Sequence, residues 1–139
     1  MKLKDYISIF ESDYSDDSVS IELSDNHFTI RLTKASSGAL NIIFVEGIAK
    51  SYILNMVLNI DDINKLSGVL YDYIVGIGAY SKIEDTQGRT FQISMSNDGL
   101  NINSMFSGGW LCLPKTLVEE LRIVLEHYIK TGKLYKVQI

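Results

Sequence analysis

Two stretches of the chain, 55 residues apart, share the same spacing of apolar residues. Residues 65–74 read KLSGVLYDYI, and residues 120–129 read ELRIVLEHYI. The coinciding pairs are Leu66 with Leu121, Val69 with Val124, Leu70 with Leu125, Tyr73 with Tyr128 and Ile74 with Ile129. Apolar residues at this spacing indicate the buried face of an α-helix. The sequence therefore predicts two helices that pack in the same way, and a repeat extending ahead of each.

The residues ahead of each predicted helix also correspond. The alternating segment 27–32 matches 90–95, and the triplet Leu-Asn-Ile occurs both at 40–42 and at 100–102. The offset between the halves is 63 residues at Phe28 and Phe91, 60 at the triplet and 55 at the helices. The differences in length therefore fall between the matching segments, where loops are expected. Insertions confined to loops are what a diverged duplication leaves.

Each half of the chain predicts four strands followed by one helix. The strands are expected at residues 18–23, 28–34, 40–45 and 52–59, and then at 77–84, 91–96, 100–105 and 110–113. We expect Asp61 to cap the first helix, and Pro114 to stand just ahead of the second. The Asn, Asp and Gly residues between strands favour short antiparallel connections. The predicted fold class is α+β, with two β-β-β-β-α repeats at about 18–74 and 77–129, antiparallel sheets and helices packed on one face.

The size and composition of the chain predict one domain over residues 1–139. With 46% hydrophobic residues, the chain can bury an ordinary core. Residues 1–17 predict an N-terminal arm, and the alternating residues 134–139 predict a last strand, whose edge could pair with a second copy in a homodimer. The sequence has no signal-peptide core, no apolar run of membrane-spanning length and a single cysteine, so a cytoplasmic protein without membrane contact is expected.

No set of residues with recognisable catalytic or metal-binding spacing occurs. Cys112 lies in an apolar run without a neighbouring His, which favours a core side chain over a nucleophile. Neither His27 nor His127 has Cys, Asp or Glu at ligand spacing. Gly76 and Gly78 follow a predicted helix, whereas a dinucleotide-binding loop opens one. We therefore expect no enzyme, no catalytic residue, no metal and no cofactor.

A repeated unit of four antiparallel strands and one helix resembles the PUR domain and, more broadly, the PC4-coactivator and Whirly families. The likeness covers about residues 18–129. It rests on Gly88 to Ile93 as a second strand, Trp110 to Pro114 leading into a helix, and the leucine-rich helix 117–129. The resemblance implies a curved sheet whose exposed face holds a single strand of DNA or RNA through basic and aromatic side chains.

The residues that we assign to such a nucleic-acid-binding face are five basic residues and one tryptophan. They are Arg31, Lys34, Lys50, Arg89, Trp110 and Lys115. The five basic residues form either a local basic strip or ordinary solvated surface. Trp110 either stacks on a base or anchors the sheet to a helix. The strand alternation predicts an open face that is polar, with one charge and no aromatic ring: Thr29, Arg31, Thr33, Asn41, Gln92, Ser94, Asn101 and Asn103.

Two functions follow as hypotheses. The first is a non-enzymatic protein that binds single-stranded DNA or RNA. The alternative is a protein-interaction module, such as a small inhibitor or adaptor of the kind that phages or mobile elements encode. The net charge of −4 and the eight tyrosines favour the alternative, because nucleic-acid binding benefits from positive charge and Tyr is common at protein interfaces.

Overall fold

The chain folds into two antiparallel sheets and two helices. The computed structural model describes residues 18–23, 28–46, 52–78 and 80–134. The elements are β1 (Ser18–Leu23), β2 (Phe28–Lys34), β3 (Leu40–Glu46), β4 (Tyr52–Leu58), α2 (Ile60–Val75), β5 (Tyr80–Glu84), β6 (Thr90–Ser96), β7 (Gly99–Ser104), β8 (Trp110–Leu113) and α3 (Lys115–Thr131). Consecutive strands pair antiparallel, in the orders β1-β2-β3-β4 and β5-β6-β7-β8. The predicted α+β class is confirmed.

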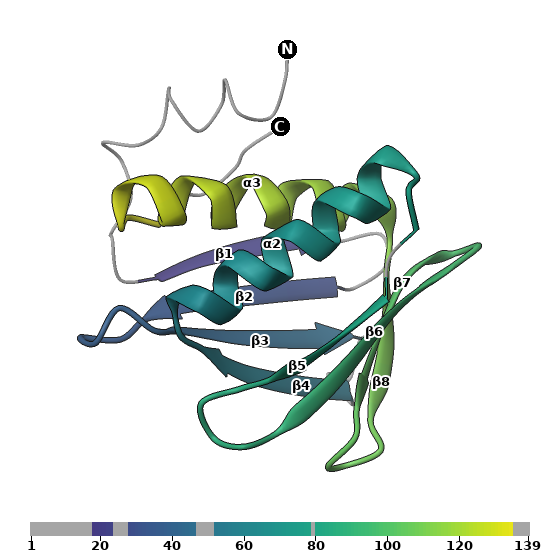
Figure 1. The fold of residues 1–139 in the computed structure, drawn as a ribbon, viewed down its shortest axis with the longest axis horizontal. Helices are drawn as coiled ribbons and strands as arrows, with labels where there is room; N and C mark the ends of the chain where they lie inside the picture. Colours follow the sequence, from purple (N-terminus) through teal and green to yellow (C-terminus); the bar gives the residue numbers. More distant parts are fainter. Residues whose placement is uncertain (1–17, 24–27, 47–51, 79, 135–139) are drawn as a thin grey trace.

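The two helices form one layer that packs against both sheets. Figure 1 shows α2 and α3 on the same face of the β1–β4 sheet, while the β5–β8 sheet stands at an angle beside β4. α2 packs against α3 and β5, and α3 also contacts β1 and β7. The arm predicted at 1–17 lies outside the described residues, as does the predicted C-terminal strand apart from Leu134, which is buried.

Alternation along each strand builds a single core from both sheets. In β2, Phe28, Ile30 and Leu32 are buried, while Thr29 and Arg31 between them are less so. The same alternation occurs in β6, where Phe91 and Ile93 are buried. The helices add their apolar stripes: Ile63, Leu66, Val69, Leu70, Leu117, Val118, Leu121, Val124, Leu125 and Tyr128. Full burial of one such aliphatic or aromatic side chain stabilises the fold by roughly 1.5–3 kcal/mol.

The ends of the helices correct two predictions. Asn59, and not Asp61, caps α2, because its Oδ1 accepts a hydrogen bond from the Asp62 amide at 2.9 Å. Asp61 lies in the first turn, where its charge complements the helix dipole. The second correction is that β5 begins at Tyr80 and not at residue 77. The helix runs to Val75, and Gly76 ends it in a left-handed conformation with φ of 81°.

No helix in the described ranges has the length and apolar character that crossing a membrane requires.

Two glycine substitutions test the packing of the β5–β8 sheet. At Gly99, which begins β7, an added Cβ would lie 2.1 Å from the backbone oxygen of Leu113 in β8. We predict that Gly99→Ala lowers the free energy of unfolding by about 3 kcal/mol, because the two strands cannot separate without losing their hydrogen bonds. Urea denaturation followed by circular dichroism measures the change.

Gly68 supplies the matched control, since it lies exposed within α2 with no atom within 4 Å of an added Cβ. Gly68→Ala should raise the free energy of unfolding by about 0.5–1 kcal/mol, because alanine favours a helix interior. Equal effects of the two substitutions would contradict the strand packing described here.

Candidate nucleic-acid interface

The outer face of the β5–β8 sheet carries two rows of mostly polar side chains, with an exposed aromatic ring at each edge of the sheet. Strand pairing places Lys82, Gln92, Asn103 and Trp110 in one row across the four strands. The next row contains Tyr80, Ser94 and Asn101. Directly paired residues point to the same face of a sheet. We name these seven residues the platform: Tyr80, Lys82, Gln92, Ser94, Asn101, Asn103 and Trp110.

The aromatic rings of the platform correct the sequence prediction of an open face without them. Tyr80 is 66% exposed on edge strand β5, and Trp110 is 53% exposed on edge strand β8. Trp110 therefore does not serve as a buried anchor between sheet and helix. The Tyr80 hydroxyl accepts a hydrogen bond from Gln92 Nε2 at 3.0 Å, which ties the ring to the adjacent strand.

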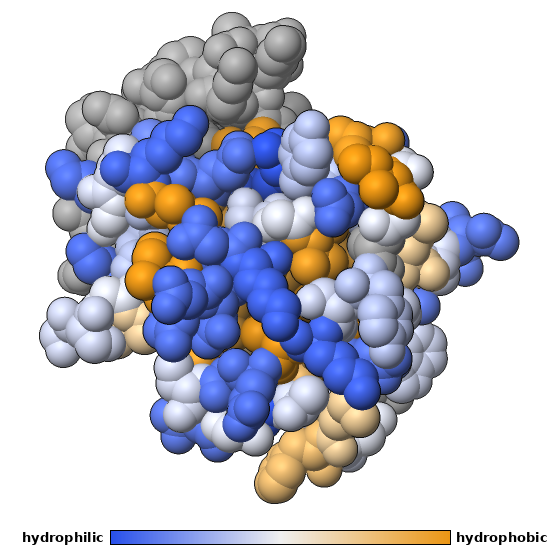
Figure 2. Space-filling model, viewed as in Figure 1, coloured by the Kyte–Doolittle hydropathy of each residue, from blue (hydrophilic) through white to orange (hydrophobic). Residues whose placement is uncertain are grey.

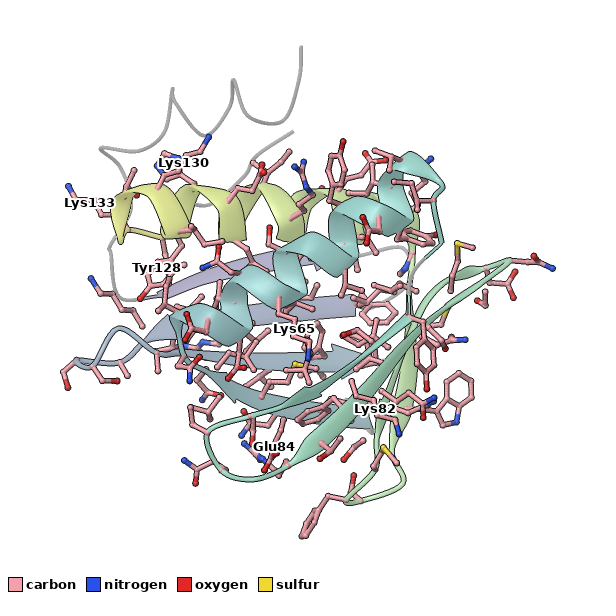
Figure 3. The ribbon with its side chains drawn as sticks, in the orientation of Figure 1. Lys65, Lys82, Glu84, Tyr128, Lys130 and Lys133 are labelled. Atoms are coloured by element: carbon pink, nitrogen blue, oxygen red, sulfur yellow. The ribbon has the colours of Figure 1, made fainter. Side chains whose placement is uncertain are left out.

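Lysine side chains gather at the edge of the platform that faces α2. Figure 3 shows Lys65 reaching from α2 toward β5, where Lys82 and Glu84 project from the strand. The Lys65 ammonium donates to the backbone oxygen of Lys82 at 2.7 Å. This contact covers a carbonyl on the free edge of β5, where an unpaired strand would otherwise be open to pairing with another chain.

At the end of β5, the carboxylate of Asp85 joins the two sheets. Its Oδ2 accepts hydrogen bonds from the backbone amide of Val57 in β4 at 3.1 Å and from Arg89 Nε at 3.0 Å. Its Oδ1 accepts from the amides of Gln87 and Arg89, both at 2.9 Å. The Thr86 amide completes the connection by donating to the Val57 carbonyl at 2.8 Å. We refer to these contacts as the Asp85 junction.

The environment of Asp85 favours its charged form. The side chain is fully buried, and burial alone would raise the pKa of the carboxyl group. The hydrogen bonds from Arg89, Val57 and Gln87 outweigh burial and hold the pKa below its ordinary value of 3.8. Arg89 adds an ion pair, with Nη2 2.9 Å from Oδ2.

A pocket of about 510 Å³ lies beside the Asp85 junction. Its lining comes from β4 (Asn55 and Val57), from the β5–β6 turn and from the β7–β8 loop; the loop and turn residues are Gln87, Gly88, Arg89 and Phe106. Phe106 is 80% exposed. Asn55 Oδ1 is shielded from water, and no group in the described part of the chain donates a hydrogen bond to it. We name this cavity the seam pocket.

The structure does not bring the predicted binding residues together in one strip. Arg31 is exposed on β2 of the β1–β4 sheet. Arg89 lines the seam pocket, and Trp110 belongs to the platform. Lys34 donates to the Gly132 carbonyl at 2.9 Å, so it supports the end of α3. Lys115 is exposed at the start of α3, and Lys50 lies outside the described residues. Their role in binding stays a prediction.

Sequence reasoning missed the site roles of three residues: Asp85, Phe106 and Asn55. Asp85 belongs to the Asp and Gly residues that predict a short connection between strands, and an Asp with Gly three residues later is also the signal for a turn closed by its own side chain. Phe106 stands between Met105 and the small residues Ser107 to Gly109. A large aromatic residue in such a loop is a signal for an exposed ring. For Asn55, the sequence carries no such signal.

No protein-family model matches the chain, and no curated protein matches its sequence.

Replacing the Asp85 carboxylate tests the junction. We predict that Asp85→Asn lowers the free energy of unfolding at pH 7 by about 2 kcal/mol, because the amide cannot accept all the hydrogen bonds that the carboxylate accepts. Because the folded pKa lies below the unfolded one, the stabilisation is complete above about pH 5 and is lost as the pH falls through the folded pKa. The difference between wild type and variant should therefore shrink in acid.

Urea denaturation of both proteins between pH 3 and pH 7 gives this difference. Asp98→Asn, in the exposed β6–β7 turn, is the matched control and should leave stability unchanged. A difference for Asp85→Asn that stays constant across the pH range would contradict the junction.

Proposed function

We propose that the protein is a non-enzymatic binding module that holds single-stranded DNA or RNA on the platform. The observation that carries the proposal is the pair of exposed rings, Trp110 and Tyr80, at opposite edges of a polar sheet face. Exposed aromatic rings on a sheet offer stacking surfaces for bases, and each stack contributes roughly 1–3 kcal/mol to binding. The polar side chains between the rings can hydrogen-bond to bases or to the sugar-phosphate backbone.

The spacing of the rings suits a strand that crosses the sheet. Neighbouring strands lie about 4.8 Å apart, so the edge strands β5 and β8 are about 14 Å apart, and Tyr80 lies one row further along the sheet than Trp110. One base can stack on Trp110 and another on Tyr80, while the nucleotides between them contact Gln92 and Asn103. Lys82 lies at the Tyr80 edge and can contact a phosphate. With few cations on the platform, stacking supplies most of the affinity.

The proposal includes an origin by duplication of a β-β-β-β-α unit. The shared triplets Leu40-Asn41-Ile42 and Leu100-Asn101-Ile102 both lie in the third strand of their sheet. In both, the Leu and Ile are buried while the Asn is partly exposed. The outer faces have diverged, because Thr29 pairs with Val45 in one sheet, whereas the corresponding residue Gln92 pairs with Asn103 in the other. This divergence supports a binding role for one face only.

Exposed apolar side chains favour protein interaction as the second candidate function. Tyr71 is 45%, Val75 47% and Ile77 74% exposed around the C-terminal end of α2. Figure 2 shows hydrophobic surface in this region. Apolar residues that cluster on a surface mark interaction sites more often than isolated ones do.

Substitution of the platform rings tests nucleic-acid binding. We predict that Trp110→Ala and Tyr80→Ala each weaken binding of a fluorescein-labelled ten-nucleotide strand about tenfold or more, because each removes one stacking surface. Fluorescence polarisation at low salt measures the affinity. Raising the salt should reduce it with a log–log slope of about −0.7 to −1.4, as expected for one or two phosphate contacts.

The matched control is Ile77→Ala, which truncates a side chain that is 74% exposed and does not belong to the platform, so it should not change the affinity. If the wild type binds no strand at tens of micromolar protein, nucleic-acid binding is overturned. A nuclease-insensitive protein partner whose capture depends on Ile77 would then favour the second candidate function.

A further inference from the structure

The seam pocket opens at the same end of the β5–β8 sheet as Trp110 of the platform. The β5–β6 turn and the β7–β8 loop meet there, since the Met105 amide donates to the Thr90 carbonyl at 2.9 Å. The Ser104 amide donates to the Gly109 carbonyl at 2.7 Å and closes the loop at its base. Phe106 in the loop lines the pocket, and Trp110 directly follows the loop on the platform. The pocket and Trp110 thus lie at one end of the sheet, and a strand that leaves the platform past Trp110 can pass around this end to the pocket.

The dimensions and lining of the pocket suit one nucleotide. Its 510 Å³ falls within the range typical of sites for small molecules. Phe106 presents an exposed ring on which a base can stack, in a loop where Figure 2 shows a hydrophobic projection. Val57 adds apolar surface from β4.

Two carboxamide side chains, Asn55 and Gln87, line the same pocket and favour adenine among the bases. A carboxamide can donate to N7 of adenine and accept from its amino group at the same time. Asn55 Oδ1 lacks a hydrogen-bond partner among the described residues, and an unsatisfied buried acceptor is unfavourable. A partial rotation of the terminal amide, which has a broad torsional preference, would bring this oxygen to the cavity beside the amide nitrogen, so that both atoms face a base.

Arg89 can hold the phosphate of the same nucleotide. The Asp85 junction fixes its guanidinium through Nε and Nη2, although the side chain stays 26% exposed. A group that is already held in place loses little conformational entropy when it binds an anion. Because Asp85 offsets part of the charge of Arg89, this phosphate contact adds less to affinity than a free arginine would.

We propose that the seam pocket binds one adenine nucleotide of a strand that lies on the platform. Phe106 stacks on the base, the carboxamide of Asn55 reads its amino group and N7, and Arg89 contacts the phosphate. The inference rests on the proposed function, which it extends from binding without base preference to a preference for adenine at one position.

The test compares two labelled ten-nucleotide strands, (dA-dC)5 and (dT-dC)5, by fluorescence polarisation. Neither strand pairs with itself, so the difference reports on adenine. Wild type should bind (dA-dC)5 about tenfold more tightly than (dT-dC)5, in line with the discrimination expected of one bidentate carboxamide contact. Asn55→Ala should abolish the preference and leave the affinity for (dT-dC)5 unchanged.

Phe106→Ala provides a second variant whose folding is not in question, because the side chain is 80% exposed. It should weaken binding of (dA-dC)5 at least threefold more than binding of (dT-dC)5. Met105→Ala is the matched control, since this neighbouring residue is 55% exposed but does not line the pocket. It should leave both affinities unchanged. Ligand-observed NMR with free AMP tests the pocket without a strand, and wild type should bind AMP more tightly than Phe106→Ala.

The outcomes separate the two proposals. Equal affinity for both strands, unaffected by Asn55→Ala and Phe106→Ala, overturns the seam pocket and leaves the platform in place. Binding of AMP without binding of either strand supports the pocket and overturns the proposed function. Binding of neither AMP nor a strand overturns both.

Discussion

The buried carboxylate of Asp85 is the interaction on which the arrangement of the two sheets depends. One oxygen joins the edge of β4 to Arg89, and the other closes the β5–β6 turn. A carboxylate can accept four or more hydrogen bonds, whereas no other short side chain can satisfy so many donors at once. The charge is kept because these bonds outweigh the cost of burial. The angle between the sheets is therefore held by a polar contact as well as by the shared core.

The two candidate binding features depend on this junction to different degrees. The seam pocket exists because the β5–β6 turn is held against β4, so that Arg89 and Asn55 line one cavity although they come from different sheets. The platform depends on the junction less directly. Its side chains stand on a sheet whose inner face is covered by the core, and the core is shared with the β1–β4 sheet and both helices. The shared core therefore supports the polar face of the β5–β8 sheet from behind.

Much of the fold could be predicted because its elements are strongly periodic. The strand around Phe91 and Ile93 and the helix around Leu121 and Leu125 each show one clear period, and both were placed correctly. Helix capping was harder to predict, since Asn59, Asp61 and Asp62 are all suitable caps and only the backbone selects one. The alternation of apolar and polar residues predicted the polar face of β6 and β7. It did not predict the side to which Trp110 points, because a four-residue strand is too short for alternation to define its face.

The candidate site was less predictable than the fold because its contacts are not local. Val57 and Asp85 are 28 residues apart, and nothing in either neighbourhood indicates that they meet. The exposure of Tyr80 and Phe106 likewise depends on where the sheets end. Composition was a poor guide as well. The net charge of −4 describes the whole chain, whereas the proposed binding on the platform relies on stacking at two rings.

The single tryptophan of the chain allows the most direct test of this account. All tryptophan fluorescence comes from Trp110, which is 53% exposed on the platform. Quenching by acrylamide measured with and without a saturating unlabelled strand reports whether the ring becomes covered. The account predicts that a bound strand reduces the quenching constant of Trp110 at least twofold, because a stacked base shields the indole. A strand that binds while the quenching constant stays unchanged would contradict it.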